Sequence, residues 1–142
     1  MKTSKDQYFI AVKVFLERRG NFLILKDNFG DWDLPGGRLL KSEFNTPLEK
    51  VVERKIREEL GKKIKYNLSK SVLFMRHERI EQIAGQPKVR IFAVGYRAKY
   101  ISGQVTLSPR HTRSEWVSRN TFKPDKYFKG GWLKGVKEYL DK

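Results

Sequence analysis

The sequence predicts a mixed α/β (α+β) fold in which a mixed β-sheet is held between α-helices. Three observations support this fold class: β-rich runs flank a long amphipathic helix, a second amphipathic segment closes the chain, and one central run is apolar on both faces. Strands and helices in this order are typical of a layered fold. With 142 residues, 39% of them hydrophobic, the chain is expected to form one domain over residues 1–142.

The first elements are two β-rich runs at 8–17 and 21–26, which predict a hairpin turning at Arg18-Arg19-Gly20. A loop at 27–31 then leads into a glycine motif. A long helix is expected between Thr46 and Gly61, and further elements follow it. Strands are expected over 64–67, 71–79, 89–100, 105–107 and 114–117, with a turn at 84–87 and a closing helix over 131–140.

The long helix is predicted from its start signal, its stop signal and its apolar stripe. Thr46 is expected to be the N-cap, followed by Pro47 at the first helical position and Glu49 completing a capping box. Gly61 supplies the stop. Between them, apolar residues recur every four positions, which predicts one face packed on the sheet. These apolar residues are Leu48, Val52, Ile56 and Leu60.

The glycine motif before this helix and the carboxylates near its end form the most informative stretch. Gly36 and Gly37 carry no side chain, so their backbone can approach an ion or a phosphate closely. Glu58 and Glu59 are hard oxygen ligands of the kind that Mg²⁺ and Mn²⁺ prefer. Arg54, one turn before Glu58, is placed to orient that carboxylate.

At these residues the chain resembles the Nudix hydrolases. Their signature is a glycine, five residues, a glutamate, seven residues, and then Arg-Glu-apolar-any-Glu-Glu-any-Gly-apolar. The positions that match it are Gly37, Glu43, Arg54, Ile56, Glu58, Glu59 and Gly61. The resemblance implies a Nudix-like fold and hydrolysis of a nucleoside diphosphate linked to another group. It also implies Mg²⁺ or Mn²⁺ as cofactor, bound by Gly36, Gly37, Glu58 and Glu59, with catalytic roles for Glu43, Arg54 and Glu58.

Three positions depart from the signature. Ten residues rather than seven separate Glu43 from Arg54, a lengthening that a loop tolerates easily. Lys62 is polar where an apolar residue is usual. Lys55 stands where a glutamate usually helps to bind metal, which removes a ligand and adds a positive charge. Lys55 has two interpretations, an ordinary contact with Glu59 one turn along the helix or a change in the chemistry of the site.

Four residues outside the signature are further candidates. Arg38 follows the glycines and is suited to clamp a phosphate through its planar guanidinium group, as an arginine does in the GDP-mannose-cleaving branch of the family. Arg76 is a candidate contact for the nucleobase of the substrate. His111 and Glu115, just before Trp116, are expected in a loop where relatives often carry a general base. The sequence leaves the choice of base open among Glu43, His111 and Glu115.

Composition limits the possible classes of protein. No cysteine is present, which excludes a disulfide framework and a thiolate zinc site. No apolar run approaches membrane-spanning length and the first residues do not resemble a signal peptide, so we expect a cytoplasmic protein with no membrane partner. The net charge of +15 favours anionic partners, nucleic acid included, although no nucleic-acid-binding motif accompanies it. The oligomeric state stays open, a homodimer included.

The sequence therefore predicts a basic protein that hydrolyses a nucleotide-type small molecule. The substrate classes are a nucleotide sugar, a dinucleotide, a nucleoside triphosphate or a capped RNA end. Water would attack a phosphorus atom or, with His111 as base, the glycosyl carbon of a nucleotide sugar. The alternative, favoured by Lys55 and the positive charge, is a catalytically weakened domain that binds or senses a nucleotide or RNA.

Overall fold

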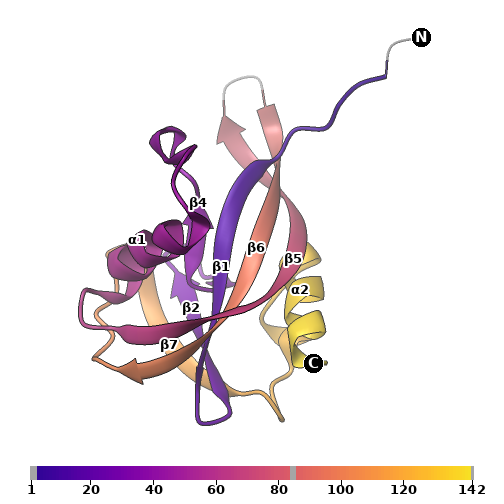
Figure 1. The fold of residues 1–142 in the computed structure, drawn as a ribbon. Helices are drawn as coiled ribbons and strands as arrows, with labels where there is room; N and C mark the ends of the chain where they lie inside the picture. The colour runs from indigo at the N-terminus through magenta and orange to yellow at the C-terminus, as the bar shows by residue number, and fades with distance from the viewer. Residues whose placement is uncertain (1–2, 84–85, 142) are drawn as a thin grey trace.

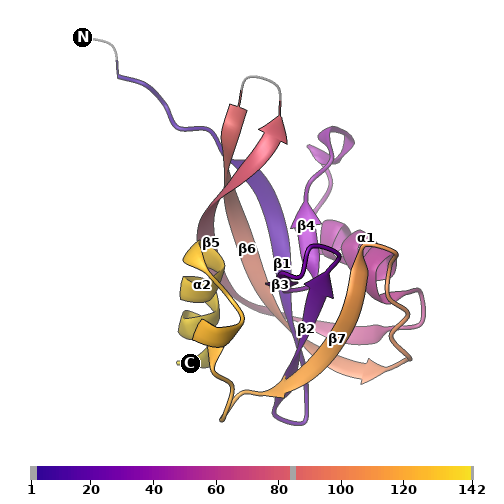
Figure 2. The ribbon, with the colours of Figure 1, turned by 180° about the vertical axis from the view of Figure 1, so that it is seen from behind.

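The computed structural model describes residues 3–83 and 86–141. The elements, in chain order, are β1 (Phe9–Arg18), β2 (Asn21–Asp27), β3 (Trp32–Asp33), β4 (Gly36–Arg38), the 3₁₀ helix η1 (Lys41–Glu43), α1 (Leu48–Leu60), β5 (Lys65–Ile83), β6 (Gln86–Ser102), β7 (His111–Ser118), the 3₁₀ helix η2 (Pro124–Lys126) and α2 (Gly130–Leu140). Helices α1 and α2 lie on opposite sides of the sheet, as both views show (Figures 1 and 2). The predicted sandwich of helices around a mixed sheet is confirmed.

The sheet formed by the described residues has the order β3-β2-β1-β6-β5, with β4 also paired to β1 and β7 to β2. β1 and β6 run parallel, whereas the other pairs run antiparallel. β6 is therefore an interior strand between β1 and β5, as its apolar run predicted. The strand β1 contacts β2 near its end and β4 near its start, so β4 and its glycines lie beside the first half of β1.

Alternating side chains of β1 supply the two halves of the core. Val12, Val14 and Leu16 face α1 and pack with the buried stripe of that helix. Ala11 and Phe15 face the other way and pack against α2, where Val136 and Tyr139 are buried. Position 13, on the α2 face between them, is a lysine that is only 5% exposed. The strand thus places one buried cation in an otherwise apolar layer.

Helix α1 differs from its prediction at the start. It begins at Leu48 with Pro47 as the cap residue, and within the described residues no side chain caps it, so the capping box expected from Thr46 is wrong. The carboxylate of Glu43 instead accepts a hydrogen bond from the backbone N–H of Leu40 at 2.8 Å, across the 3₁₀ helix η1 that precedes the lengthened loop. The end is as predicted: Gly61 has a φ of 95° and terminates the helix.

Three other expectations are corrected by the fold. The strands expected over 64–67 and 71–79 are parts of one strand, β5, with an irregularity in its pairing between Leu68 and Val72. Residues 105–107 are loop rather than strand, and His111 begins β7 rather than lying in a loop. The turn expected at 84–87 includes residues 84 and 85, which lie outside the described residues.

The loop between β6 and β7 is attached to the end of α1 by two backbone hydrogen bonds. The N–H of Thr106 donates to the carbonyl of Leu60 at 2.8 Å, and the N–H of Ser108 donates to the carbonyl of Glu59 at 3.2 Å. These bonds use carbonyl groups that the helix end leaves without a helical partner. The loop that precedes His111 is therefore fixed to the helical turn that carries Glu59.

Neither helix in the described part of the chain combines the length and the hydropathy that a membrane span requires.

Candidate functional site

The glycine turn, which is Gly36 and Gly37 at the start of β4, lies against β1 so closely that only glycine fits at its first position. Gly36 pairs with Lys13 in the sheet and has a φ of 135°. A Cβ atom at this position would lie 2.1 Å from the carbonyl oxygen of Val12, which is backbone and cannot move aside. The N–H of Gly36 donates to Oε1 of Glu59 at 2.8 Å. The turn and the end of α1 are thus joined directly.

Arg54 connects two carboxylates of the signature, those of Glu43 and Glu58. Its Nε and Nη2 atoms donate to the two oxygens of Glu43, each at 2.7 Å, and Nη1 donates to Glu58 at 2.8 and 2.9 Å. Nη2 also donates to the carbonyl of Arg38 at 3.2 Å. The hydrogen bond from Arg54 holds the pKa of Glu43 below its usual value. At Glu58, burial acts to raise the pKa, but Arg54 and Lys55 together still hold it below its usual value.

Lys55 lies between the carboxylates of Glu58 and Glu59, beside Gly37. Its Nζ atom is 3.4 Å from Oε1 of Glu58 and 3.6 Å from Oε2 of Glu59. Its side chain is only 13% exposed. A Cβ atom on Gly37 would lie 2.6 Å from Cε and 2.8 Å from Nζ of this lysine, so the absence of a side chain at Gly37 makes the room that the ammonium group occupies.

A cleft of about 470 Å³ opens beside this cluster. Among the described residues, six cationic side chains and three anionic ones line it. The cations are Lys13, Arg38, Arg54, Lys55, Arg79 and Arg110, and the anions are Asp33, Glu58 and Glu81. The lining comes from β1, β3, β4 with its two glycines, α1, β5, β6 and α2, together with Leu40 and the loop before β7. Such an excess of positive charge in a concave site attracts anionic ligands.

A larger hollow of about 890 Å³ lies elsewhere, between residues 5–9 and the paired strands at 78–80 and 87–90. It lacks the glycine turn and the helix carboxylates. We therefore place the candidate site in the smaller cleft, where these groups meet.

The residues of the cleft do not fit a divalent metal ion as they are arranged. Such an ion needs several oxygen ligands, but Glu59 already accepts from Gly36, both oxygens of Glu58 accept from Arg54, and Lys55 lies within 3.6 Å of both carboxylates. At an effective dielectric constant of about 20, an ion of charge +2 placed about 4 Å from an ammonium group is repelled by about 8 kcal/mol, which cancels the attraction of one carboxylate at the same distance. Among the described residues, no group of three or more His, Cys, Asp or Glu could hold a metal. A metal at the predicted position would require Lys55 to move away.

Arg38, predicted to bind substrate, lines the cleft. Its Nη1 atom donates to Oε1 of Glu81 at 3.0 Å, its Nη2 atom pairs with the other oxygen, and its guanidinium carbon lies 4.7 Å from the ring centre of Phe9. Arg79 also contacts Glu81, at 3.4 Å. An anionic ligand would therefore compete with Glu81 for two arginine side chains.

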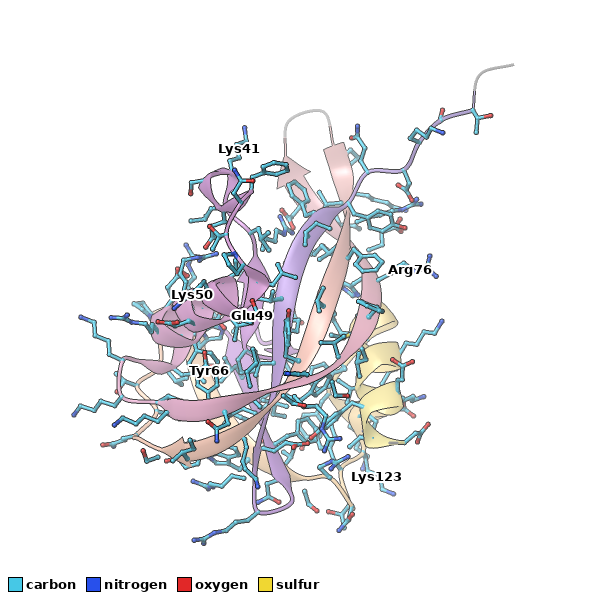
Figure 3. All side chains as sticks on the ribbon, viewed as in Figure 1. Lys41, Glu49, Lys50, Tyr66, Arg76 and Lys123 are labelled. Atoms are coloured by element: carbon cyan, nitrogen blue, oxygen red, sulfur yellow. The ribbon has the colours of Figure 1, made fainter. Side chains whose placement is uncertain are left out.

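Arg76, the other predicted substrate contact, lies outside the cleft. It is exposed on β5 and borders a different hollow, near Phe74 and Lys134. Figure 3 shows it well apart from Glu49 and Lys50 of α1. The structure does not bring Arg76 together with the glycine turn.

The two candidate bases near the end of the chain take different positions. Nδ1 of His111 lies 2.9 Å from Oγ of Ser108, in the loop that is bonded to Glu59, and the neighbouring Arg110 lines the cleft. His111 itself lies next to the lining residues rather than among them. Glu115 lies within β7 opposite Ile24 and pairs with Arg113 at 2.5 Å. Of the two, His111 is the one that is adjacent in sequence to a residue of the cleft lining, Arg110.

Several lining residues were not predicted from the sequence. Lys13 is buried and pairs with Asp33 at 2.9 Å, and its Nζ atom lies 5.0 Å from the centre of the Trp132 ring. A lysine within the apolar run of β1 was a signal that could have revealed it, because a lysine is almost never buried without a partner. Arg79, Glu81 and Trp132 carry no such local signal, since only the tertiary fold brings β5 and α2 to the glycine turn.

Comparison of the sequence with protein-family models gives no match, and comparison with curated proteins gives none either. Solved structures, in contrast, are similar over nearly the whole chain. The chain resembles a MutT Nudix hydrolase from Burkholderia pseudomallei with a TM-score of 0.66 and 23% identity, covering 93% of this chain and 98% of the other. A MutT protein from Methanosarcina mazei Go1 gives 0.68 and 22% identity, covering 98% and 96%.

An ADP-ribose pyrophosphatase from Streptococcus suis 89-1591 is also similar, with a TM-score of 0.64 and 15% identity, covering 95% of this chain and 91% of the other. At these identities the likeness establishes the fold. The chain therefore has the Nudix fold, as the sequence resemblance implied.

Proposed function

We propose that the protein hydrolyses a compound in which a nucleoside diphosphate is linked to another group. The observation that carries this proposal is the cleft in which the glycine turn meets the Glu58–Glu59 end of α1 under a surplus of cationic side chains. The name of the S. suis structure, an ADP-ribose pyrophosphatase, describes hydrolysis of a substrate of this class and supports the proposal.

The arginines of the cleft supply the phosphate contacts in this proposal. Arg38, Arg79 and Arg110 line one space, and guanidinium groups bind phosphate oxygens through paired hydrogen bonds. Arg38 and Arg79 would leave Glu81 as they take hold of the diphosphate. The same positive charges would stabilise the negative charge that develops on the leaving group.

His111 is the general base that the geometry favours. Glu43 is poorly suited to accept a proton, because both of its oxygens accept hydrogen bonds from Arg54 and its pKa is lowered. Glu115 is paired with Arg113 in β7. His111 is attached through Ser108 to the loop beside Glu59, and in the tautomer whose Nδ1–H donates to the serine hydroxyl, Nε2 is free to take a proton from water.

The attacked atom determines the products. Attack on a phosphorus atom breaks a P–O bond and releases a nucleoside monophosphate and a second phosphorylated fragment. Attack on the glycosyl carbon of a nucleotide sugar breaks the C–O bond and releases a nucleoside diphosphate and the free sugar. The family resemblance implies Mg²⁺ or Mn²⁺ as cofactor, an ion that the residues of the cleft do not fit as they are arranged. Each assay should therefore run with and without these ions.

A substrate panel with two variants tests the proposal. Dinucleotides, nucleotide sugars, nucleoside triphosphates and capped RNA are incubated with the wild type, and ¹⁸O-labelled water then shows whether phosphate or sugar takes up the oxygen. We expect Glu59→Gln to lower kcat by at least about a hundredfold, because the amide can still accept from Gly36 but removes the negative charge that lies beside Lys55. Glu53→Gln, a half-exposed glutamate of the same helix that pairs with Lys50, is the matched control and should retain activity.

The second candidate function is binding without turnover, and the position of Lys55 between Glu58 and Glu59 favours it. In that case the protein would bind a nucleotide or an RNA end tightly, and no member of the panel would be hydrolysed under any metal condition. Such a result would overturn the hydrolase proposal.

A further inference from the structure

The Lys55 ammonium group is held in one place by charge and by packing. Two carboxylates lie within 3.6 Å of Nζ, and the backbone of Gly37 lies beneath it. Because the side chain is 13% exposed, most of its length is packed while the group still lines the cleft. A cation that is already oriented loses little freedom when an anion binds to it.

We propose that the cleft binds the diphosphate of its ligand without a divalent metal ion, and that Lys55 supplies the positive charge at Glu58 and Glu59. A diphosphate needs cations on its oxygens, and a protein can provide them either as a metal ion or as side chains. This cleft carries six cationic side chains, and one of them occupies the space between the carboxylates that would otherwise attract a metal. Nearby positive charge therefore opposes metal binding and favours direct contact with phosphate.

This inference concerns binding and depends on the proposed function only for the class of ligand. It also accounts for the departure at position 55. The lysine replaces a glutamate that would have been a ligand, and Gly37 beneath it leaves room for an ammonium group. A glutamate at position 55 would reverse the charge at this point and create a third carboxylate beside Glu58 and Glu59.

Equilibrium binding of ADP and GDP, measured by calorimetry in excess EDTA and again in millimolar MgCl₂, tests the proposal. For the wild type we expect the two Kd values to agree within about threefold, which corresponds to about 0.7 kcal/mol. Lys55→Met, similar in length but uncharged, should weaken binding in EDTA by about tenfold or more. Lys55→Glu should bind appreciably only when Mg²⁺ is present.

Two further variants keep the result interpretable. Lys50→Met removes an exposed lysine of the same helix and should leave both Kd values unchanged. If Lys55→Met does not fold because it leaves two carboxylates uncompensated, Lys55→Met combined with Glu58→Gln keeps the charge of the cluster constant and should show the same loss. The proposal is overturned if the wild type binds only with Mg²⁺, or if a folded variant without the lysine binds as tightly as the wild type in EDTA.

The outcome separates this inference from the proposed hydrolysis. Binding in EDTA without turnover of any substrate would support the role of Lys55 and refute the hydrolase. Turnover accompanied by binding that requires Mg²⁺ would support the hydrolase and refute the role of Lys55.

Discussion

At the scale of single residues, Arg54 holds the site together. It links Glu43, whose side chain is 10% exposed, to Glu58 and to the carbonyl of Arg38, so one side chain connects the lengthened loop, α1 and the glycine turn. Removing Arg54 would leave a buried carboxylate without its charged partner. This lowers the free energy of unfolding more than the loss of an exposed ion pair does.

We predict that Arg54→Gln lowers the free energy of unfolding by about 1–2 kcal/mol at neutral pH. Because Arg54 lowers the pKa of Glu43 from its ordinary value of 4.5, the pair stabilises the fold above that pH and loses its effect as the pH falls through the lowered value. The difference between wild type and variant should therefore shrink below about pH 4. Denaturant titrations at several pH values measure this difference.

The control for this prediction is Arg57→Gln, an exposed arginine one turn from the same pair. It should change the free energy of unfolding by less than about 0.5 kcal/mol at every pH. A constant difference between wild type and Arg54→Gln across the acid range would show that Glu43 does not carry the effect.

At the scale of elements, the start of α2 depends on one histidine. Nδ1 of His77 on β5 accepts a hydrogen bond from the N–H of Gly131 at 3.1 Å, and its ring stacks on Trp132 with 4.5 Å between ring centres. Acceptance at Nδ1 requires the neutral ring. Burial, followed by the charge of Arg79, lowers the pKa of His77 below its ordinary value of 6.5.

The docking of α2 should consequently weaken in mild acid. Because the folded state lowers the pKa of His77, its contribution is complete above pH 6.5 and is lost as the pH falls through the lowered value. We predict that the free energy of unfolding of the wild type decreases between pH 6.5 and about 5, and that His77→Gln shows a smaller decrease over the same range. Urea titrations of both proteins provide the measurement, and equal slopes would contradict the role of His77.

The sequence predicts elements well where the signal is local. The hairpin at Arg18-Arg19-Gly20, the stop at Gly61 and the closing helix are all read from neighbouring residues, and each is confirmed within one residue. The failures concern long-range pairing. β5 continues past position 68 because β6 pairs along it, and 105–107 are loop because their backbone bonds to the end of α1 rather than to a strand.

The same division applies to the site. The glycine turn and the α1 carboxylates could be expected from the sequence, since they lie on one motif, and the structure brings Gly36 and Glu59 into contact. The partner of Arg38 could not be expected from the sequence. Glu81 is 43 positions away and contacts Arg38 only because of the order of the strands in the sheet. For the same reason, nothing local indicated that Arg76 would lie outside the cleft.

At the scale of the whole molecule, the net charge of +15 means that many basic side chains have no acidic partner of their own. Their combined field extends through solution over roughly 30 Å at 0.01 M salt but only about 8 Å at 0.15 M. The charge therefore acts mainly on how fast anions arrive rather than on the fold.

We predict that the association rate of ADP falls several-fold between these two salt concentrations, whereas its dissociation rate changes less. Stopped-flow mixing with a fluorescent analogue of ADP gives both rates. Adenosine, which carries no phosphate, is the matched control and should show little dependence on salt. An equal response of ADP and adenosine would exclude long-range attraction as the cause. Binding of nucleic acid and formation of a homodimer stay predictions from the sequence.

The two backbone bonds between the loop before β7 and the last turn of α1 have a mechanical consequence. Arg110 is two residues from Ser108, whose N–H is bonded to the carbonyl of Glu59. When a phosphate draws Arg110 inward, the pull reaches the helix end along this short path, and Glu59 in turn holds the N–H of Gly36. The loop that carries Arg110 and the strand that begins at Gly36 are thus linked through Glu59, so we expect a ligand held by Arg110 to influence the position of Gly36.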